Sequence, residues 1–491
     1  MGAGLLQLVC RGQHDNYLCI NPDMSYFKHA WKKHTNFAME NIQLEFNTLP
    51  TIDPDIIDGE YICKISRIGD LLKNLYFHCT LPKIYSSSNL AFKWVKNIGN
   101  ILVKKATIKL DGYPIDTLTS DWLNIWNELT MDTDRFDKMI GNIPQLNNPS
   151  LTSSKKVIIN NNKFFYNYYP NSSIQNNIPS IDEYNLVIPL PFWFTKNPSL
   201  ALPLLRLQSQ EITLTIQLEN SEKLYTVYSN DLEENISSLF YNEIYSKNLE
   251  SGIKKKDKIN IKKFTKSLNI KPYIEAVYVY LDVDERNEIF KKSSLSYIVE
   301  QIDITTQNII QKSFNNTIIN INAKKPTKEI IWLTRRDDYI SNFNAHCNYT
   351  ASIRQNDSYG IMDRASIIWD KTKIIVDDKN ADFYNKIQPY QYHTNIPKYN
   401  GMYFYSFALY PEKNNPSGFY NASLVETQLS IYTKHYDDDN PNVNLNIKLN
   451  KNNKFTELNL DKNVKNYLID IYSISYNVFE IIGNTAGLKF A

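Results

Sequence analysis

The chain has 491 residues, more than one hydrophobic core usually serves, and its 42% hydrophobic and 13% aromatic content is ample for two packed domains. Its 54 basic and 52 acidic residues leave a net charge of +2, which argues against a broad nucleic-acid-binding surface and a direct nucleic-acid partner. Five scattered cysteines are too few for a disulfide framework, and no apolar run reaches the roughly 18 residues that span a bilayer. We therefore expect reduced thiols, a cytoplasmic setting and no transmembrane segment.

The first periodic apolar pattern predicts a helix over Pro114–Leu129, with Asp116 as its candidate N-cap. Its apolar residues follow helical spacing at Leu118, Trp122, Ile125, Trp126 and Leu129. We expect Trp122 and Trp126 to anchor this helix in the core rather than to form contact hot spots. A second short helix is predicted around Pro198–Gln208.

Alternating apolar and polar residues predict several β-strands, because side chains of a half-buried strand alternate between core and solvent. The pattern is clearest at Glu211–Glu219, Leu445–Leu449 and Tyr472–Val478. Tyr273–Asp282 is apolar on both faces, as expected of a strand inside a two-sheet core. Many strands with turn residues between them and few helices indicate β-sandwiches or jelly rolls.

Three polar stretches interrupt this pattern and are predicted to be loops at strand ends, where extra length is tolerated. They are Asn142–Asp182, Asn220–Lys271 and His435–Asn453. The second stretch contains a run of lysines between Lys254 and Lys263, which is either a solvated loop or a phosphate-binding patch.

Motifs for catalysis or cofactor binding are missing from the sequence, which has no GxGxxG, GxxxxGK[ST], HExxH or GxSxG. Asp282, Asp284 and Glu285 end a predicted strand, where carboxylates either hold a divalent metal or form a charged exit beside Arg286. The run Arg335–Asp338 is predicted to be a solvated turn. We expect no active site, no metal and no cofactor.

Nine blocks of sequence, spread over most of the chain, occur in the order of one known family. They are Gly4–Val9 with Tyr17-Leu18 and His34–Glu40, Asp121–Thr130, Ile188–Phe194 with Asn197–Pro203, Leu281–Arg286, Val299–Gln301, Lys328–Trp332, Gln388–Gln391 with His393-Thr394, Gly401–Ser423, and Ser475–Leu488. In these blocks the chain resembles the major capsid proteins of nucleocytoplasmic large DNA viruses, of the mimivirus and chlorella-virus type.

The resemblance implies an all-β fold of two tandem eight-stranded antiparallel jelly rolls, a double jelly roll, with a few short helices and long end loops. The first jelly roll is then expected at residues 26–286, with loop insertions at about 142–182 and 220–271. The second is expected at 296–491, after a linker at 287–295. Residues 1–25 would form an N-terminal arm.

The same resemblance implies a structural capsid subunit and not an enzyme. Three chains would form a homotrimer, a capsomer of pseudo-hexagonal outline, and these capsomers would tile an icosahedral virion shell that is made and assembled in the host cytoplasm. The expected partners are the chain itself, neighbouring capsomers, minor capsid proteins and the inner-membrane side of the virion.

Assembly roles are expected in two segments. The arm residues that would bury against another surface, or within their own trimer, are Leu5, Leu6, Leu8, Val9, Tyr17 and Phe27. The tyrosines that would form either the outward crown of the capsomer or a solvated loop are Tyr166, Tyr168 and Tyr169. Phe192, Trp193 and Phe194 are expected to pack in the core and between the jelly rolls.

Two alternatives stay open. The chain departs from the family pattern at Arg11–Asp15, Cys19-Ile20 and His29–Lys33, which leaves a minor capsid-like paralogue, with a role at a special vertex or in assembly, as an alternative to the main shell subunit. Asp282, Asp284 and the tyrosines of the insertion would instead suit a jelly-roll glycan-binding protein.

Overall fold

A computed structural model gives the structure of the chain. It describes Val9 together with residues 34–52, 59–85, 90–149, 179–229, 234–239, 268–311, 316–351, 360–371, 373–434 and 465–490. The strand predicted at Leu445–Leu449 and the lysine run lie outside these residues.

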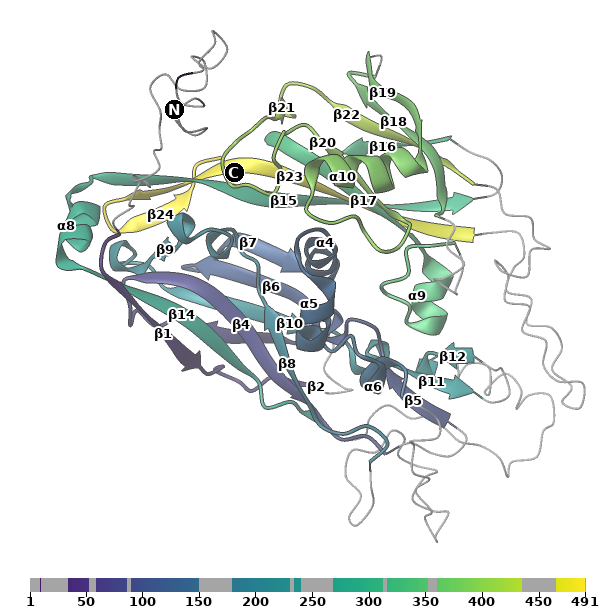
Figure 1. Ribbon diagram of the computed structural model, residues 1–491, viewed down its shortest axis with the longest axis horizontal. Coiled ribbons are helices and arrows are strands. Elements are labelled where there is room, and N and C mark those ends of the chain that lie inside the picture. Colours follow the sequence, from purple (N-terminus) through teal and green to yellow (C-terminus); the bar gives the residue numbers. More distant parts are fainter. Residues whose placement is uncertain are drawn as a thin grey trace, which may run out of the picture.

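The first part of the chain forms a sandwich of two antiparallel sheets, each built on four main strands (Figure 1). One sheet has the order β1 (Phe37–Leu44), β14 (Tyr273–Leu281), β4 (Leu71–Leu81) and β8 (Tyr184–Pro189). The other has the order β3 (Glu60–Lys64), β10 (Ile212–Leu218), β6 (Val103–Leu110) and β7 (Tyr113–Thr119).

The second part of the chain repeats this architecture. One sheet has the order β15 (Ser294–Gln311), β23 (Lys465–Ile482), β17 (Pro326–Arg336) and β20 (Met402–Ser406). The other has the order β16 (Asn316–Ile321), β22 (Thr427–Thr433), β18 (Met362–Trp369) and β19 (Lys373–Asn380).

The two sandwiches have the same topology when their eight main strands are counted in chain order. In each, one sheet runs first, eighth, third, sixth, and the other runs second, seventh, fourth, fifth. This is the strand order of a jelly roll, in which the first and last strands lie side by side. The fold is therefore the double jelly roll that the resemblance implied.

Shorter strands extend or accompany these sheets. A three-stranded sheet contains β12 (Glu234–Ile236), β11 (Tyr225–Ser229) and β5 (Leu90–Trp94). The remaining strands are β2 (Thr51–Ile52), β13 (Leu268–Asn269), β9 (Leu202–Pro203), β21 (Tyr420–Asn421) and β24 (Thr485–Leu488). The prediction of an uninterrupted loop at Asn220–Lys271 is therefore wrong, because β11, β12 and β13 fall within it.

The helices are short. They are α3 (Ile98–Leu102), α4 (Ser120–Thr130), α5 (Thr133–Ile140), α6 (Pro144–Asn147), α8 (Val283–Lys291), α9 (Asp337–Phe343) and α10 (Gln388–Tyr392), with a π-helical turn, η7, at Phe383–Ile387 and 3₁₀ turns η1 (Trp193–Thr195), η2 (Pro198–Leu200), η3 (Leu204–Arg206) and η4 (Ser221–Lys223). Among the described residues, no helix has the length and apolar character needed to cross a membrane.

The helix predicted at Pro114–Leu129 forms only in its second half. Residues up to Thr119 pair with β6 as strand β7, and the Thr119 hydroxyl caps α4 by accepting a hydrogen bond from Trp122 N at 3.3 Å. The prediction of Asp116 as the N-cap is wrong, since its carboxylate accepts hydrogen bonds from the backbone of Thr117 and Trp193. Pairing with β6 overrides the helical spacing of the apolar residues.

The helix predicted at Pro198–Gln208 is also wrong, because only the 3₁₀ turns η2 and η3 form there, on either side of β9. In contrast, three predicted strands are confirmed as β10, β14 and β23. The predicted loop at Asn142–Asp182 begins with helix α6, and residues 150–178 lie outside the described part.

The second sandwich lies across the first with its β15-β23-β17-β20 sheet at the junction, where α4 packs (Figure 1). Ten of the eleven residues of β17 are buried, so this strand has no solvent face. Its side chains divide between two cores: Ile331 and Leu333 join the core of the first sandwich, whereas Ile330 and Trp332 lie in the core of the second. The junction sheet therefore serves both hydrophobic cores.

The glycine that precedes β20 tests how tightly this junction is packed. Gly401 has φ +107°, and a Cβ there would lie 1.9 Å from the Tyr349 carbonyl oxygen. We expect Gly401→Ala to lower the free energy of unfolding by about 3 kcal/mol or more, measured by urea denaturation. Gly483→Ala is the matched control, because Gly483 also has positive φ (+61°) but has nothing within 4 Å, and it should cost about 1 kcal/mol. Equal losses would contradict the packing argument.

Candidate functional site between the two sandwiches

Most residues to which the sequence assigned assembly roles lie outside the described part of the chain. This holds for Leu5, Leu6, Leu8, Tyr17 and Phe27, and for Tyr166, Tyr168 and Tyr169. Val9 is described and is 73% exposed. The structure therefore neither supports nor contradicts these assignments.

The acidic cluster at the end of β14 forms a helix start and not a converging ligand set. The Asp282 carboxylate caps α8 by accepting a hydrogen bond from Val283 N at 2.7 Å, and Asp284 and Glu285 lie in the first turn. Arg286 pairs with Asp70 at 2.6 Å rather than with this cluster. Within the described ranges, no group of three or more His, Cys, Asp and Glu residues is placed to hold a metal ion.

An aromatic seam joins the two sandwiches. Trp122 of α4 lies 6.1 Å from Tyr472 of β23, and Trp193 of η1 lies 5.2 Å from Phe479 of the same strand, measured between ring centroids. Trp122, Trp193 and Phe479 are all buried. The expectation that Trp122 anchors a helix and that Phe192–Phe194 packs between the jelly rolls agrees with these contacts.

Buried charges cross the same junction. Arg335 at the end of β17 forms an ion pair with Asp121 of α4, with Nη1 2.8 Å from Oδ1, and a second ion pair with Asp470 of β23. The prediction that Arg335–Asp338 is a solvated turn is wrong, since Arg335 and Arg336 are buried. Burial alone lowers the pKa of Arg335, but the two carboxylates outweigh it and raise that pKa, so the guanidinium stays charged.

A second charged group centres on Glu300 of β15. Its carboxylate accepts hydrogen bonds from Lys196, which follows η1 in the first sandwich, at 2.7 Å and from Lys328 of β17. Burial raises the pKa of Glu300, but the two ammonium groups outweigh it and lower the pKa to about 2. Lys196 also lies 4.2 Å from the centroid of the Trp126 ring, so α4 contributes a cation–π contact to this group.

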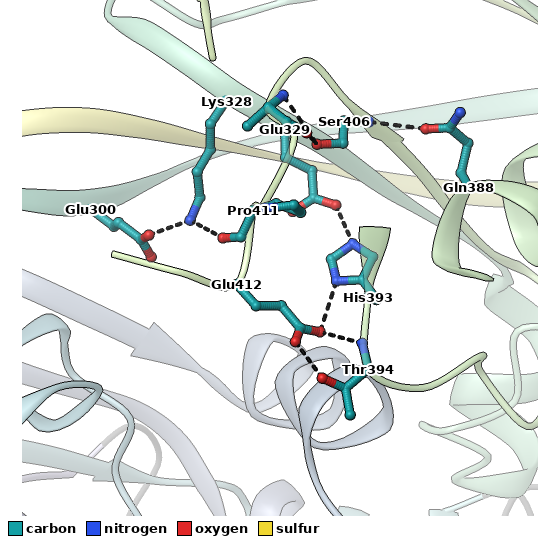
Figure 2. A network of polar contacts seen from close by, with 10 residues as sticks. Glu300, Lys328, Glu329, Gln388, His393, Thr394, Ser406, Pro411 and Glu412 are labelled. Carbon is teal, nitrogen blue, oxygen red and sulfur yellow. Dashed lines mark hydrogen bonds and ion pairs between the residues drawn. The ribbon is translucent and has the colours of Figure 1, made fainter. Parts of the chain in front are cut away.

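A third group continues from Lys328 to a buried histidine (Figure 2). His393 Nε2 lies 2.5 Å from Glu329 Oε1, and its Nδ1 lies 3.1 Å from Glu412 Oε1. Glu412 also accepts hydrogen bonds from the backbone and hydroxyl of Thr394. Burial alone lowers the pKa of His393, but the two carboxylates outweigh it and raise the pKa to about 9.

Hydrogen bonds to backbone carbonyls complete the joint. The Arg206 guanidinium of η3 donates to carbonyls at the end of α8 and beyond, those of Ile289, Lys292 and Gly483 among them. At the other end of the junction, Asn395 donates through its side chain to the carbonyl of Met131, just after α4. The joint therefore extends from the α8 crossover to the far end of α4.

Chemically, this arrangement fixes geometry. The buried charges are neutralised by oppositely charged partners, some of them across the junction. A different orientation of the two sandwiches would separate the partners that lie across the junction and leave buried charges unpaired, which is costly. No role was predicted from the sequence for Glu300, Lys328, Glu329 and His393, although all four lie in family-like blocks. The available signal was a charged residue inside an otherwise apolar strand, as in Lys328-Glu329 before Ile330–Trp332.

Comparisons with known proteins extend over nearly the whole chain. Residues 25–282 match the family model described as major capsid protein N-terminus, and residues 285–487 match the one described as large eukaryotic DNA virus major capsid protein. The major capsid protein of Phaeocystis pouchetii virus is 26% identical, with 100% of both chains covered. Probable capsid protein 4 of Acanthamoeba polyphaga mimivirus is also 26% identical, over 100% of this chain and 99% of its own.

Among solved structures, the quasi-atomic model of the PBCV-1 virus capsid superimposes with a TM-score of 0.66 at 21% sequence identity. The match covers 95% of this chain and 100% of that chain. At this identity the likeness establishes the fold, and it agrees with the strand order of both sandwiches.

The charge balance around Arg335 makes a stability prediction. We expect Arg335→Met to lower the free energy of unfolding by about 3–5 kcal/mol, because Asp121 and Asp470 would remain buried without their cation. Arg364→Met is the control: Arg364 and Asp378 form a half-exposed pair, so its loss should change the free energy by less than about 1 kcal/mol. Urea denaturation measures both. Similar effects in the two variants would show that burial of the charges does not matter.

The raised pKa of His393 makes the stability depend on pH. A histidine whose folded pKa is about 9, against 6.5 unfolded, stabilises the fold fully below pH 6.5 and loses this contribution as pH rises to about 9. The loss should amount to about 3 kcal/mol, at about 1.4 kcal/mol per pKa unit. The double variant His393→Gln with Glu329→Gln should show a smaller fall in unfolding midpoint over this range. Parallel pH profiles would contradict the assignment.

Proposed function

Since the chain belongs to the family of large eukaryotic DNA virus major capsid proteins, we propose that it assembles as a homotrimer of pseudo-hexagonal outline that tiles the icosahedral shell. The chain is a structural protein of the virion capsid, and its double jelly roll is the building unit. The observation that carries the proposal is the rigid joint between two sandwiches of identical strand order. It sets the angle between two similar units within one chain, so three chains present six such units around one axis.

We further propose that the jelly rolls correspond to residues 26–286 and 296–491. All sheets of the described residues pair strands from one side of this division only, since the last strand of the first sandwich ends at Leu281 and the next begins at Ser294. The residues proposed as linker, 287–295, contain the end of α8 and the start of β15. The arm at residues 1–25 would then lie under the shell, toward minor capsid proteins and the inner-membrane side of the virion.

The remaining assignments follow from the same role. Leu5, Leu6, Leu8 and Val9 of the arm would bury against another protein surface, and Tyr166, Tyr168 and Tyr169 would lie in the outward crown of the capsomer. A purely structural role requires no catalysis, so we propose that the chain is not an enzyme. Its synthesis and assembly would take place in the host cytoplasm.

A minor capsid-like paralogue is the second candidate, because one full-length relative is named probable capsid protein 4 rather than major capsid protein. Mass spectrometric quantification of purified virions separates the two roles. A main shell subunit should dominate the virion protein by mass, whereas a vertex or assembly protein should be a small fraction. A glycan-binding role would have used Asp282 and Asp284, but Asp282 instead caps α8.

The trimer makes a direct prediction for the purified full-length chain. Sedimentation velocity should give a species of about three times the 57.3 kDa chain mass, and negative-stain electron microscopy should show particles of pseudo-hexagonal outline. A monomer at every concentration up to tens of micromolar would contradict the proposal.

A further inference from the structure

A short segment after α10 crosses from the second sandwich to the first. It consists of residues 393–399, which we call the strap and which have no regular secondary structure. Asn395 N donates a hydrogen bond of 2.9 Å to the carbonyl of Leu129, near the end of α4. Lys398 N donates to the Glu128 carboxylate of the same helix at 3.2 Å. These backbone hydrogen bonds hold the strap on the last turn of α4.

The strap begins at a histidine that lies between two carboxylates. Figure 2 shows His393 with Glu329 of β17 at one ring nitrogen and Glu412, which follows β20, at the other. The ring of Phe404 of β20 lies 5.7 Å from the His393 ring, measured between centroids. Both ring nitrogens must carry a hydrogen to donate to both carboxylates, so this arrangement requires the charged imidazolium.

The charges connected to His393 balance when this histidine is protonated. Lys328, the neighbour of Glu329 on β17, donates hydrogen bonds to the carboxylate of Glu300 and to the carbonyl of Pro411. The connected group therefore sets three cations against three carboxylates, Lys196, Lys328 and His393 against Glu300, Glu329 and Glu412. Loss of the histidine proton leaves one negative charge in excess among buried side chains, which is costly.

Glu412 is the carboxylate that can move away when this happens. Its side chain is 22% exposed, whereas that of Glu329 is 4% exposed. A neutral imidazole donates from one nitrogen and presents a lone pair at the other, so it holds one carboxylate and repels the second. Glu412 can turn toward water, and it then gives up its hydrogen bonds to the backbone and hydroxyl of Thr394, the second residue of the strap.

We propose that protonated His393 holds the strap on α4, and that loss of its proton at alkaline pH releases the strap. Burial lowers the pKa of His393, but the two carboxylates outweigh it and raise the pKa to about 9, so the strap is held at neutral pH and released as the pH rises through about 9. The release is local, because the ion pair of Arg335 with Asp121 does not involve the strap. It uncovers the end of α4 while both hydrophobic cores stay folded.

Hydrogen–deuterium exchange of the full-length chain, followed by mass spectrometry, tests the release. Exchange times are scaled to the chemical exchange rate at each pH, and peptides covering residues 394–400 report on the amides of Asn395 and Lys398. With a pKa of about 9 for His393 in the held strap and 6.5 after release, proton linkage predicts that protection falls about twentyfold between about pH 7.5 and about pH 9.5. Peptides from β10 should stay protected at both pH values.

Two substitutions should remove this pH dependence and leave the strap in opposite states. His393→Gln cannot carry the charge, so the strap should be unprotected at both pH values. Glu412→Gln removes the excess negative charge while its amide oxygen can still accept a hydrogen bond from Thr394 N, so the strap should be protected at both. If these contacts only packed the segment in place, both variants would lose protection.

His346→Gln is the matched control. His346 Nε2 lies 3.0 Å from the Lys223 carbonyl oxygen in another contact between the sandwiches, and burial lowers the pKa of His346 to about 4, so it stays neutral over the tested range. This variant should keep the pH response of the wild type. A wild-type strap with equal protection at both pH values, a parallel loss in β10, or the same state of the strap in His393→Gln and Glu412→Gln would overturn the proposal.

Discussion

Burial of β17 and β23, the central strands of the β15-β23-β17-β20 sheet, on both faces is the constraint on which the rest of the structure depends. A sheet in this position must satisfy apolar packing on each side and also pair every charge that it carries inward. Arg335, Glu300 and Glu329 are such charges, and each finds its counterion on another element. The partners of Arg335 and Glu300 include residues of the first sandwich, so the second sandwich reaches charge balance only when docked.

This pairing explains why the joint determines orientation as well as contact. Apolar surfaces such as those of Trp122 and Trp193 tolerate sliding, because hydrophobic attraction is not directional. A buried ion pair does not, since a displacement of a few ångströms leaves a charge unpaired in a medium of low polarity. The aromatic seam thus supplies attraction, and the charged groups select one angle between the sandwiches. For a subunit that must tile a shell, that angle decides whether copies fit together.

The sequence predicted those features that depend on local periodicity. Strand β10 was predicted from its alternating side chains and β14 from its apolar run. Both patterns are visible in the sequence because all side chains on one face of a strand share the same surroundings. The start of α4 was missed because Leu118 fits helical spacing with Trp122, and only pairing of β7 with β6 decides otherwise. The charged joint was not predicted at all: Arg335 and Asp121 are 214 positions apart, and no local pattern links them. The order of family-like blocks gave the architecture, but not which residues face each other.

The chemistry of the joint between the two sandwiches suits a subunit whose shape must be set before it assembles. The joint within the chain forms once, at folding, and its buried charges give one permanent geometry. A capsid shell repeats the contacts between its subunits many times, so each such contact can be weak and reversible while their sum is strong. Reversible contacts can build a regular shell only from subunits of one shape. Buried ion pairs such as Arg335–Asp121, which fix the angle between the two sandwiches within each chain, supply that single shape.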